Sequence, residues 1–134
     1  MNRDIIKLIK DALNHMGCPL SVMSKIDANA PIVFSFNNGV VMNLSMVNDE
    51  IWLWSPIHDY SEKLIAQNGA KFLELVMRPY PFFATGKMQL SNEEGKLMLQ
   101  GLVNEESLEK AAYFAAALQV FFDTAFKLRQ VIKE

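Results

Sequence analysis

The chain has 134 residues, a formal net charge of −2 and a hydrophobic fraction of 51%. This length suits one compact domain spanning residues 1–134, and the apolar richness excludes an intrinsically disordered chain. The slightly acidic balance provides no electrostatic basis for binding nucleic acid. No apolar run approaches the ~20 residues that span a bilayer, and charged residues are spaced through the N-terminus, unlike a signal peptide. We therefore expect a cytoplasmic domain without membrane insertion.

The first elements of the chain are a helix and an irregular stretch. Apolar residues recur at helical spacing over residues 3–16, and Gly17 is placed to end that helix. Pro19 and Pro31 bracket the irregular stretch, for which we predict one short helical turn around Val22.

Three strands are predicted next, over residues 32–37, 40–47 and 50–55. They are separated by Asn38-Gly39 and Asn48-Asp49, which are typical hairpin turn sequences. Short strands joined by such turns pair in antiparallel fashion.

The second helix is predicted over residues 62–78. Asp59 or Ser61 is a suitable cap for its start, and Pro79 and Pro81 close its end.

Two more strands and a long helix complete the chain. The strands are predicted at 87–91 and 96–103, on either side of a turn at 92–95. Asn104 is expected to cap a last helix that runs to Ile132, with Glu105 and Glu106 suiting the positive end of the helix dipole. The order α-β-β-β-α-β-β-α predicts an α+β domain with an antiparallel sheet flanked by helices.

The strand 50–55 is apolar on both of its faces, because Ile51-Trp52-Leu53-Trp54 alternates between them. If Asn48-Asp49 is a two-residue loop, Ile51 and Leu53 share a core face with Met42, Leu44 and Met46. The indoles of Trp52 and Trp54 then fall on the other face, beside Asn43 and Ser45. Two indoles on the more polar face of a sheet indicate a surface that something else covers.

The register of the first hairpin stays open at this level. A two-residue Asn38-Gly39 turn puts Phe34 and Phe36 on the face of the tryptophans, whereas a three-residue loop puts them in the core. Turn chemistry favours the first register and simple amphipathicity the second.

Candidate chemistry is nearly absent. His15 and His58 have no Cys or second His at metal-ligand spacing, so we expect no metal site. Cys18, between a glycine and a proline, is interpreted as a small buried residue rather than a nucleophile. The paired carboxylates lie in turns or at a helix start, and the glycines never cluster into a phosphate loop. The sequence predicts neither an enzyme nor a cofactor.

Apolar side chains are in surplus on the second and last helices, where they spread wider than one stripe. In a small domain such a surplus is typical of an oligomer or partner interface, although a generously packed monomer core is the simpler explanation for any one residue. The pattern favours a dimer.

Several segments together resemble the invasion protein B/SpaK family of class IB type III secretion chaperones. They are the helix ending in Gly17-Cys18-Pro19 with Ser21, the stretch Ile26-Asp27-Ala28-Asn29-Ala30 leading into Ile32, and Val47-Asn48-Asp49-Glu50 running into Ile51-Trp52-Leu53-Trp54. The resemblance covers nearly the full length, including the order of the elements and the long last helix. The region around Pro79-Tyr80-Pro81-Phe82-Phe83 departs from it.

The resemblance implies a cytoplasmic homodimer that binds an N-terminal segment of secreted effector proteins. The segment is held extended and competent for secretion, and the chaperone uses no ATP. Proteins of this class serve several effectors.

The resemblance also implies which element mediates dimerisation, because the family pairs through its second helix. On that helix we expect the dimer interface at Ile65, Phe72, Val76 and Met77. For effector binding we expect Trp52 and Trp54 from the register, and with less reason Ile6, Phe34, Phe36 and Met42. The alternative is an α+β small-molecule-binding or structural interaction module, in which the tryptophans line a ligand pocket.

Overall fold

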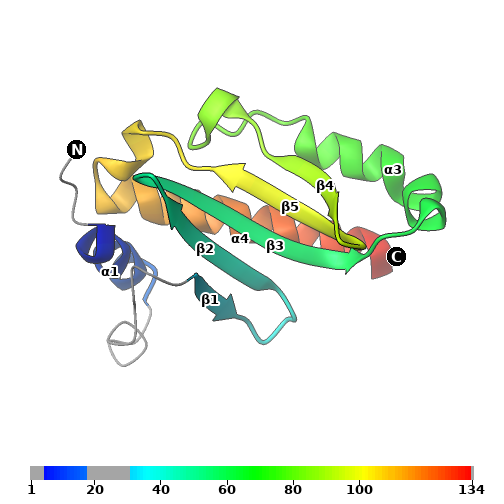
Figure 1. Cartoon of the computed structure of the whole chain (residues 1–134), viewed down its shortest axis with the longest axis horizontal. Helices are drawn as coiled ribbons and strands as arrows, with labels where there is room; N and C mark the ends of the chain where they lie inside the picture. Colours follow the sequence, from blue (N-terminus) through cyan, green and yellow to red (C-terminus); the bar gives the residue numbers. More distant parts are fainter. Residues whose placement is uncertain (1–4, 18–30, 134) are drawn as a thin grey trace.

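The structure is a computed structural model that describes residues 5–17 and 31–133 (Figure 1). The predicted α+β class and order of elements are confirmed. The predicted helical turn around Val22, together with Cys18 and Pro19, lies outside the described residues. The helices and strands are α1 (Ile5–His15), β1 (Ile32–Ser35), β2 (Val41–Val47), β3 (Glu50–Asp59), α3 (Glu62–Val76), β4 (Gln89–Glu93), β5 (Lys96–Leu102) and α4 (Ala111–Lys133), with short 3-10 helices η1 (Ala84–Gly86) and η2 (Glu106–Leu108).

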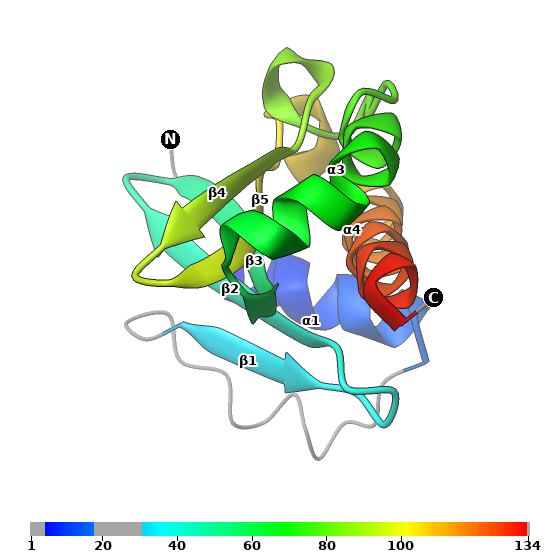
Figure 2. The same cartoon turned by 90° about the vertical axis from the view of Figure 1, so that its right-hand side faces the viewer.

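The five strands form one antiparallel sheet in the order β1-β2-β3-β5-β4. The long helix α4 runs behind the sheet, where α1 and α3 both pack against it (Figures 1 and 2). Among the described residues no helix lies on the opposite side, which we call the open face. One surface of the sheet therefore faces the core. The other surface consists of strand side chains that no described helix covers.

The core lies between the sheet and α4. Leu44, Ile51 and Leu53 on the sheet have no exposed surface, and neither do Phe114 and Phe121 on α4. Burying each such side chain contributes about 1.5–3 kcal/mol to folding. This layer fixes which face of each strand points inward.

The β2–β3 hairpin has the predicted two-residue loop. Asn48 and Asp49 both adopt positive φ, 51° and 64°, as a tight turn between twisted strands requires. Val47 pairs with Glu50 and Ser45 with Trp52, which confirms the predicted register.

The β1–β2 hairpin has the three-residue loop. The Phe36 amide donates to the Val40 carbonyl at 3.0 Å, and Phe34 pairs with Met42. The loop closes through Gly39, whose φ of 90° suits a residue without a side chain. Phe34 and Phe36 consequently share the face of the core.

Of the two caps predicted for the second helix one is confirmed, and the predicted end of the third strand is wrong. Ser61, and not Asp59, caps α3, since its Oγ accepts from the Leu64 amide at 3.0 Å. The strand β3 continues past Pro56 to Asp59, with a register shift between Pro56 and His58.

The last helix also begins later than predicted. The Asn104 side chain accepts from the Ser107 amide at 2.9 Å, in the turn that leads into η2, and does not cap α4. The Ser107 hydroxyl, which lies 3.1 Å from the Phe82 carbonyl, ties this turn to the segment after α3. The chain then starts the long helix at Ala111.

Ser55 gives a test of how the core is assembled. It has no exposed surface, faces the core beside Leu53, and its hydroxyl has no hydrogen-bond partner among the described residues. Ser55→Ala removes this unsatisfied group and is expected to leave the free energy of unfolding unchanged or to raise it by about 1 kcal/mol. Leu53→Ala, on the same face, should lower it by about 2–5 kcal/mol. Urea denaturation of both variants checks this, and a loss above about 1 kcal/mol for Ser55→Ala would contradict it.

Candidate functional site

The open face carries a mixed polar and apolar surface. Strand alternation and the pairing registers place side chains from all five strands on it. Val33 and Val47, near its margins, are 57% and 51% exposed, unusually high for valine in a strand. The residues on this face include Val33, Ser35, Val41, Asn43, Ser45, Val47, Trp52, Trp54, Pro56, Gln89, Ser91, Met98, Gln100 and Leu102.

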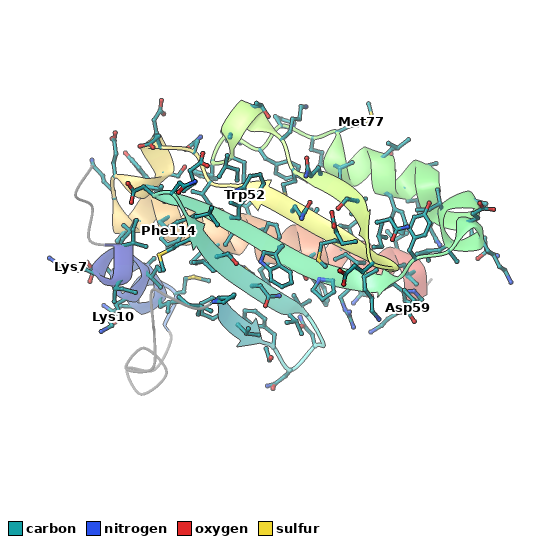
Figure 3. All side chains as sticks on the ribbon, in the orientation of Figure 1. Lys7, Lys10, Trp52, Asp59, Met77 and Phe114 are labelled. Carbon is teal, nitrogen blue, oxygen red and sulfur yellow. The ribbon has the colours of Figure 1, made fainter. Side chains whose placement is uncertain are left out.

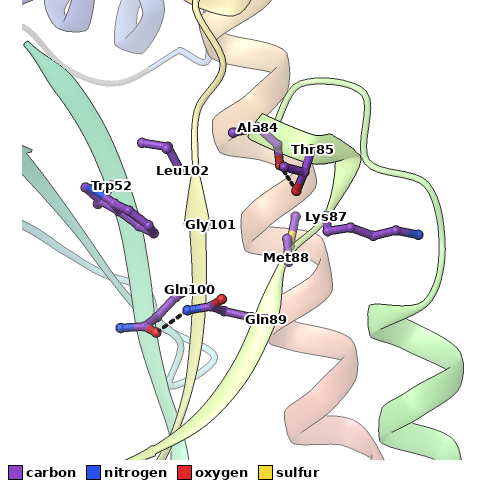
Figure 4. Close-up of a pocket in the computed structure, with 9 residues that line it drawn as sticks. All are labelled: Trp52, Ala84, Thr85, Lys87, Met88, Gln89, Gln100, Gly101 and Leu102. Carbon is purple, nitrogen blue, oxygen red and sulfur yellow. Dashed lines mark hydrogen bonds between the residues drawn. The ribbon is translucent and has the colours of Figure 1, made fainter.

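The two tryptophans dominate this face, as predicted from the register. Both are half-buried. The indole N–H of Trp54 donates to Ser45 Oγ at 3.1 Å, and Asn43 Nδ2 donates to the Trp54 carbonyl at 3.4 Å. Trp54 is thereby oriented by neighbours on β2, while Trp52 forms one wall of a small pocket next to β5 (Figure 4). The structure brings these two predicted residues together on a surface that no described helix covers.

The other residues predicted for effector binding lie elsewhere. Met42 is 1% exposed in the core. The ring of Phe36 lies 4.4 Å from that of Phe122 on α4, and Phe34 packs against the core on the same side of the sheet. Ile6 is half-buried on α1. The six predicted residues therefore do not form one surface, and only the two tryptophans belong to the open face.

A second apolar surface lies between α3 and β4. It is a groove of about 470 Å³ whose walls include three residues predicted for the dimer interface, Ile65, Phe72 and Val76. Phe72 forms its base and is 2% exposed, whereas the fourth predicted residue, Met77, is 67% exposed at the end of α3 (Figure 3). We refer to this surface as the α3–β4 groove.

Two further residues of the groove were missed by the sequence prediction. Leu73, which is 57% exposed, and Leu90 on β4 both line it. Leu73 could have been found, because it follows Ile65 and Gly69 at helical spacing on the same stripe. Leu90 could not, since its contribution depends on the packing of β4 beside α3.

The described residues offer little for catalysis. They contain no group of three or more His, Cys, Asp or Glu side chains able to hold a metal ion. The one resolved shift in acidity is at Asp59, where the hydrogen bond and charge of Lys96 hold the pKa of the carboxyl below its usual value. Asp59 lies at the exposed end of β3, paired with Lys96 on β5, and does not line the α3–β4 groove itself. The open face and the α3–β4 groove are therefore the two candidate sites.

Comparisons with known proteins agree with this geometry. A family model described as the invasion protein B family matches residues 17–94, more than half of the chain. The chain belongs to the invasion protein B family. This family is type III secretion-associated, and its matched region contains both tryptophans and all of α3. The predicted resemblance is thus confirmed.

Two relatives extend the similarity to nearly the full length. Surface presentation of antigens protein SpaK from Salmonella typhimurium is 28% identical over 120 residues, which cover 90% of this chain and 89% of the relative. SpaK from Salmonella typhi matches with the same identity and coverage. Among the described residues, no helix combines the length and the apolar character needed to cross a membrane.

Single-tryptophan variants test whether the open face is free in solution. Because both indoles are half-buried and no described helix covers them, the remaining tryptophan in Trp52→Phe and in Trp54→Phe should be quenched by acrylamide. A control is the same measurement in denaturant, which gives the limit for full exposure. An indole that resists quenching in either folded variant would show that the face is covered.

Proposed function

We propose that this protein is a chaperone of type III secretion. It binds the N-terminal segment of a secreted effector across its open face and keeps that segment extended, without using ATP. The observation that carries this proposal is the pair of half-buried tryptophans on a sheet surface that no described helix covers. Membership of the invasion protein B family supports it.

An extended client fits the physics of this face. The strands β1 and β4 form the two edges of the sheet, and an added strand can pair with the main-chain groups of an edge. Main-chain hydrogen bonds form with any client sequence. The preference for particular client side chains therefore has to come from apolar contacts on the open face. Ordering a flexible segment costs entropy, which a broad apolar footprint offsets.

We also propose that two copies associate through the α3–β4 groove. The groove is open and apolar, and Leu73 and Met77 beside it are more than half exposed. A stable dimer interface removes about 800 Å² from each partner, which exceeds the groove itself and requires the outer side of α3 as well. Dimerisation would leave the open face of each copy accessible, since the groove lies beside α3 on the other side of β4.

The client-binding proposal is tested by co-purification followed by limited proteolysis. The tagged protein should retain a polypeptide whose protease-protected fragment comes from its N-terminus. Trp52→Ser with Trp54→Ser should weaken retention by about tenfold or more, because large aromatic side chains dominate interface energies. Tyr113→Ser is the matched control, since Tyr113 is 45% exposed on α4, far from the open face.

Two outcomes would contradict the proposal. One is a purified protein that retains no polypeptide, or protects a folded domain rather than a terminal segment. The other is a folded double tryptophan variant, checked by circular dichroism, that retains the fragment as tightly as Tyr113→Ser.

The dimer is tested on residues whose replacement does not disturb the core. Leu73→Glu with Met77→Glu places two charges where a partner would bury them, so sedimentation equilibrium should show monomers. Phe72 is unsuitable because its burial makes Phe72→Glu a folding defect. Tyr113→Glu is the control and should stay dimeric, and a dimer that survives in the double variant would remove the α3–β4 groove as its interface.

A further inference from the structure

A small pocket opens at the edge of the open face where the pairing of β4 with β5 stops. The last regular pair is Gln89 with Gln100, and the next contact between the two segments is an isolated bridge from Phe83 to Val103. Between them, the five residues 84–88 lie opposite only the two residues 101–102, so the longer segment bulges outward. The bulge leaves a hollow of about 200 Å³ (Figure 4).

Two local features hold this hollow open. Thr85 and Gly86 both have positive φ, 58° and 71°, which turns the chain sharply at the pocket wall. For a β-branched residue such as threonine this conformation is unfavourable, and strained residues of this kind cluster at functional sites. On the inner side, a side chain at Gly101 would lie 2.8 Å from ring carbons of Phe83, so only glycine lets the segment approach β5.

The size of the pocket suits one side chain. Small-molecule sites typically occupy about 300–1,000 Å³, so this hollow is too small for most metabolites. Its apolar surface comes from the Trp52 ring, the Leu102 side chain and the Met88 thioether. Thioethers and aromatic faces adapt to flexible apolar partners.

The charged and hydrogen-bonding groups around the pocket further restrict which side chain can occupy it. The wall contains no carboxylate, and the Lys87 side chain points away from the hollow, with Nζ donating to the Met77 carbonyl at 3.3 Å (Figure 4). A lysine or arginine would therefore enter without a partner for its charge. On the rim, Gln100 Oε1 accepts from Gln89 Nε2 at 3.0 Å and from Ser91 Oγ at 3.2 Å. These two bonds orient the Gln100 amide, so its NH₂ group is available to donate to a carbonyl of a chain that crosses the face.

We propose that this Trp52 pocket anchors one leucine or methionine side chain of the bound effector segment and thereby fixes the register of that segment on the open face. The inference rests on the proposed client binding and adds to it the chemistry and position of one recognised residue. The Gln100 amide holds the client main chain next to the anchor. A client with alanine or lysine at the anchor position binds more weakly.

The test uses random 16-residue peptides displayed on phage and selected against three forms of the full chain. The forms are the natural protein, Leu102→Trp, which fills the pocket, and Tyr113→Trp, which adds a tryptophan on α4, outside the open face. The natural protein and Tyr113→Trp should enrich peptides with leucine or methionine at one fixed position. For such a peptide, Leu102→Trp and replacement of the anchor by alanine or lysine should each weaken binding by about tenfold or more.

A measurement on the natural protein covers the case in which Leu102→Trp does not fold. Adding a selected peptide to protein with ¹³C-labelled methionine methyl groups should shift the Met88 resonance, and Met46, which faces the core side of β2, should not move. A Met88 resonance that does not shift while the peptide binds would overturn the proposal that the pocket holds the anchor side chain.

The selection also separates the two proposals. Equal enrichment against all three forms would overturn the anchor pocket and leave client binding in place. Failure of the natural protein to enrich any peptide would overturn the pocket together with the proposed function.

Discussion

The division of β3 between two environments is the constraint on which the rest of this molecule depends. The tight turn at Asn48 and Asp49 fixes the pairing of β2 with β3, and that pairing sends Ile51 and Leu53 into the core. Because side chains alternate along a strand, the neighbouring indoles must face the other way. A slip by one residue would bury the tryptophans and expose the core residues. The turn therefore sets both the stability of the domain and the character of its open face.

Much of the fold could be predicted because local and global signals agree. At the second hairpin, turn chemistry and hydrophobic alternation both require a two-residue loop. At the first hairpin turn chemistry and hydrophobic alternation disagree, and burial of the phenylalanines selects the three-residue loop. Phe36 packs on Phe122 of α4, a tertiary contact that no local sequence pattern contains. The prediction that Asn104 caps the last helix is wrong. Asn104 accepts from the Ser107 amide in the turn at η2, and the Ser107 hydroxyl lies 3.1 Å from the carbonyl of Phe82, in a segment distant in sequence.

The functional surfaces were predictable only in part, for a similar reason. The position of the tryptophans follows from the register of β2 with β3. The residues of the proposed dimer interface on α3 were expected from the family resemblance, and three of them line the α3–β4 groove. The Trp52 pocket does not, because it depends on the path of residues 84–88 and on the left-handed conformation of Thr85. Phe34 lies on the core face because of the register of β1, which the sequence left open. Met42 lies there because of the register of β2 with β3, which had already separated it from the tryptophans in the sequence analysis.

The segment after α3 joins the two surfaces physically. Its Tyr80 hydroxyl donates to the Leu75 carbonyl, and Lys87 Nζ donates to the Met77 carbonyl at 3.3 Å, so both side chains satisfy carbonyl groups at the end of α3. The same segment then provides Thr85 and Met88 to the Trp52 pocket. One anchored connection thus lies between the helix proposed for dimerisation and the pocket proposed for client recognition.

The chain contains two tryptophans, so the two indole N–H resonances in a ¹⁵N spectrum report directly on the open face. The measurement that tests the central claim is a titration of the labelled protein with the protease-protected N-terminal fragment of its client. The account predicts that both indole resonances shift as the fragment binds, with Trp52 moving more than Trp54, because Trp52 lines the pocket and Trp54 is already held by Ser45. Saturation of binding with both indole resonances unmoved would contradict it.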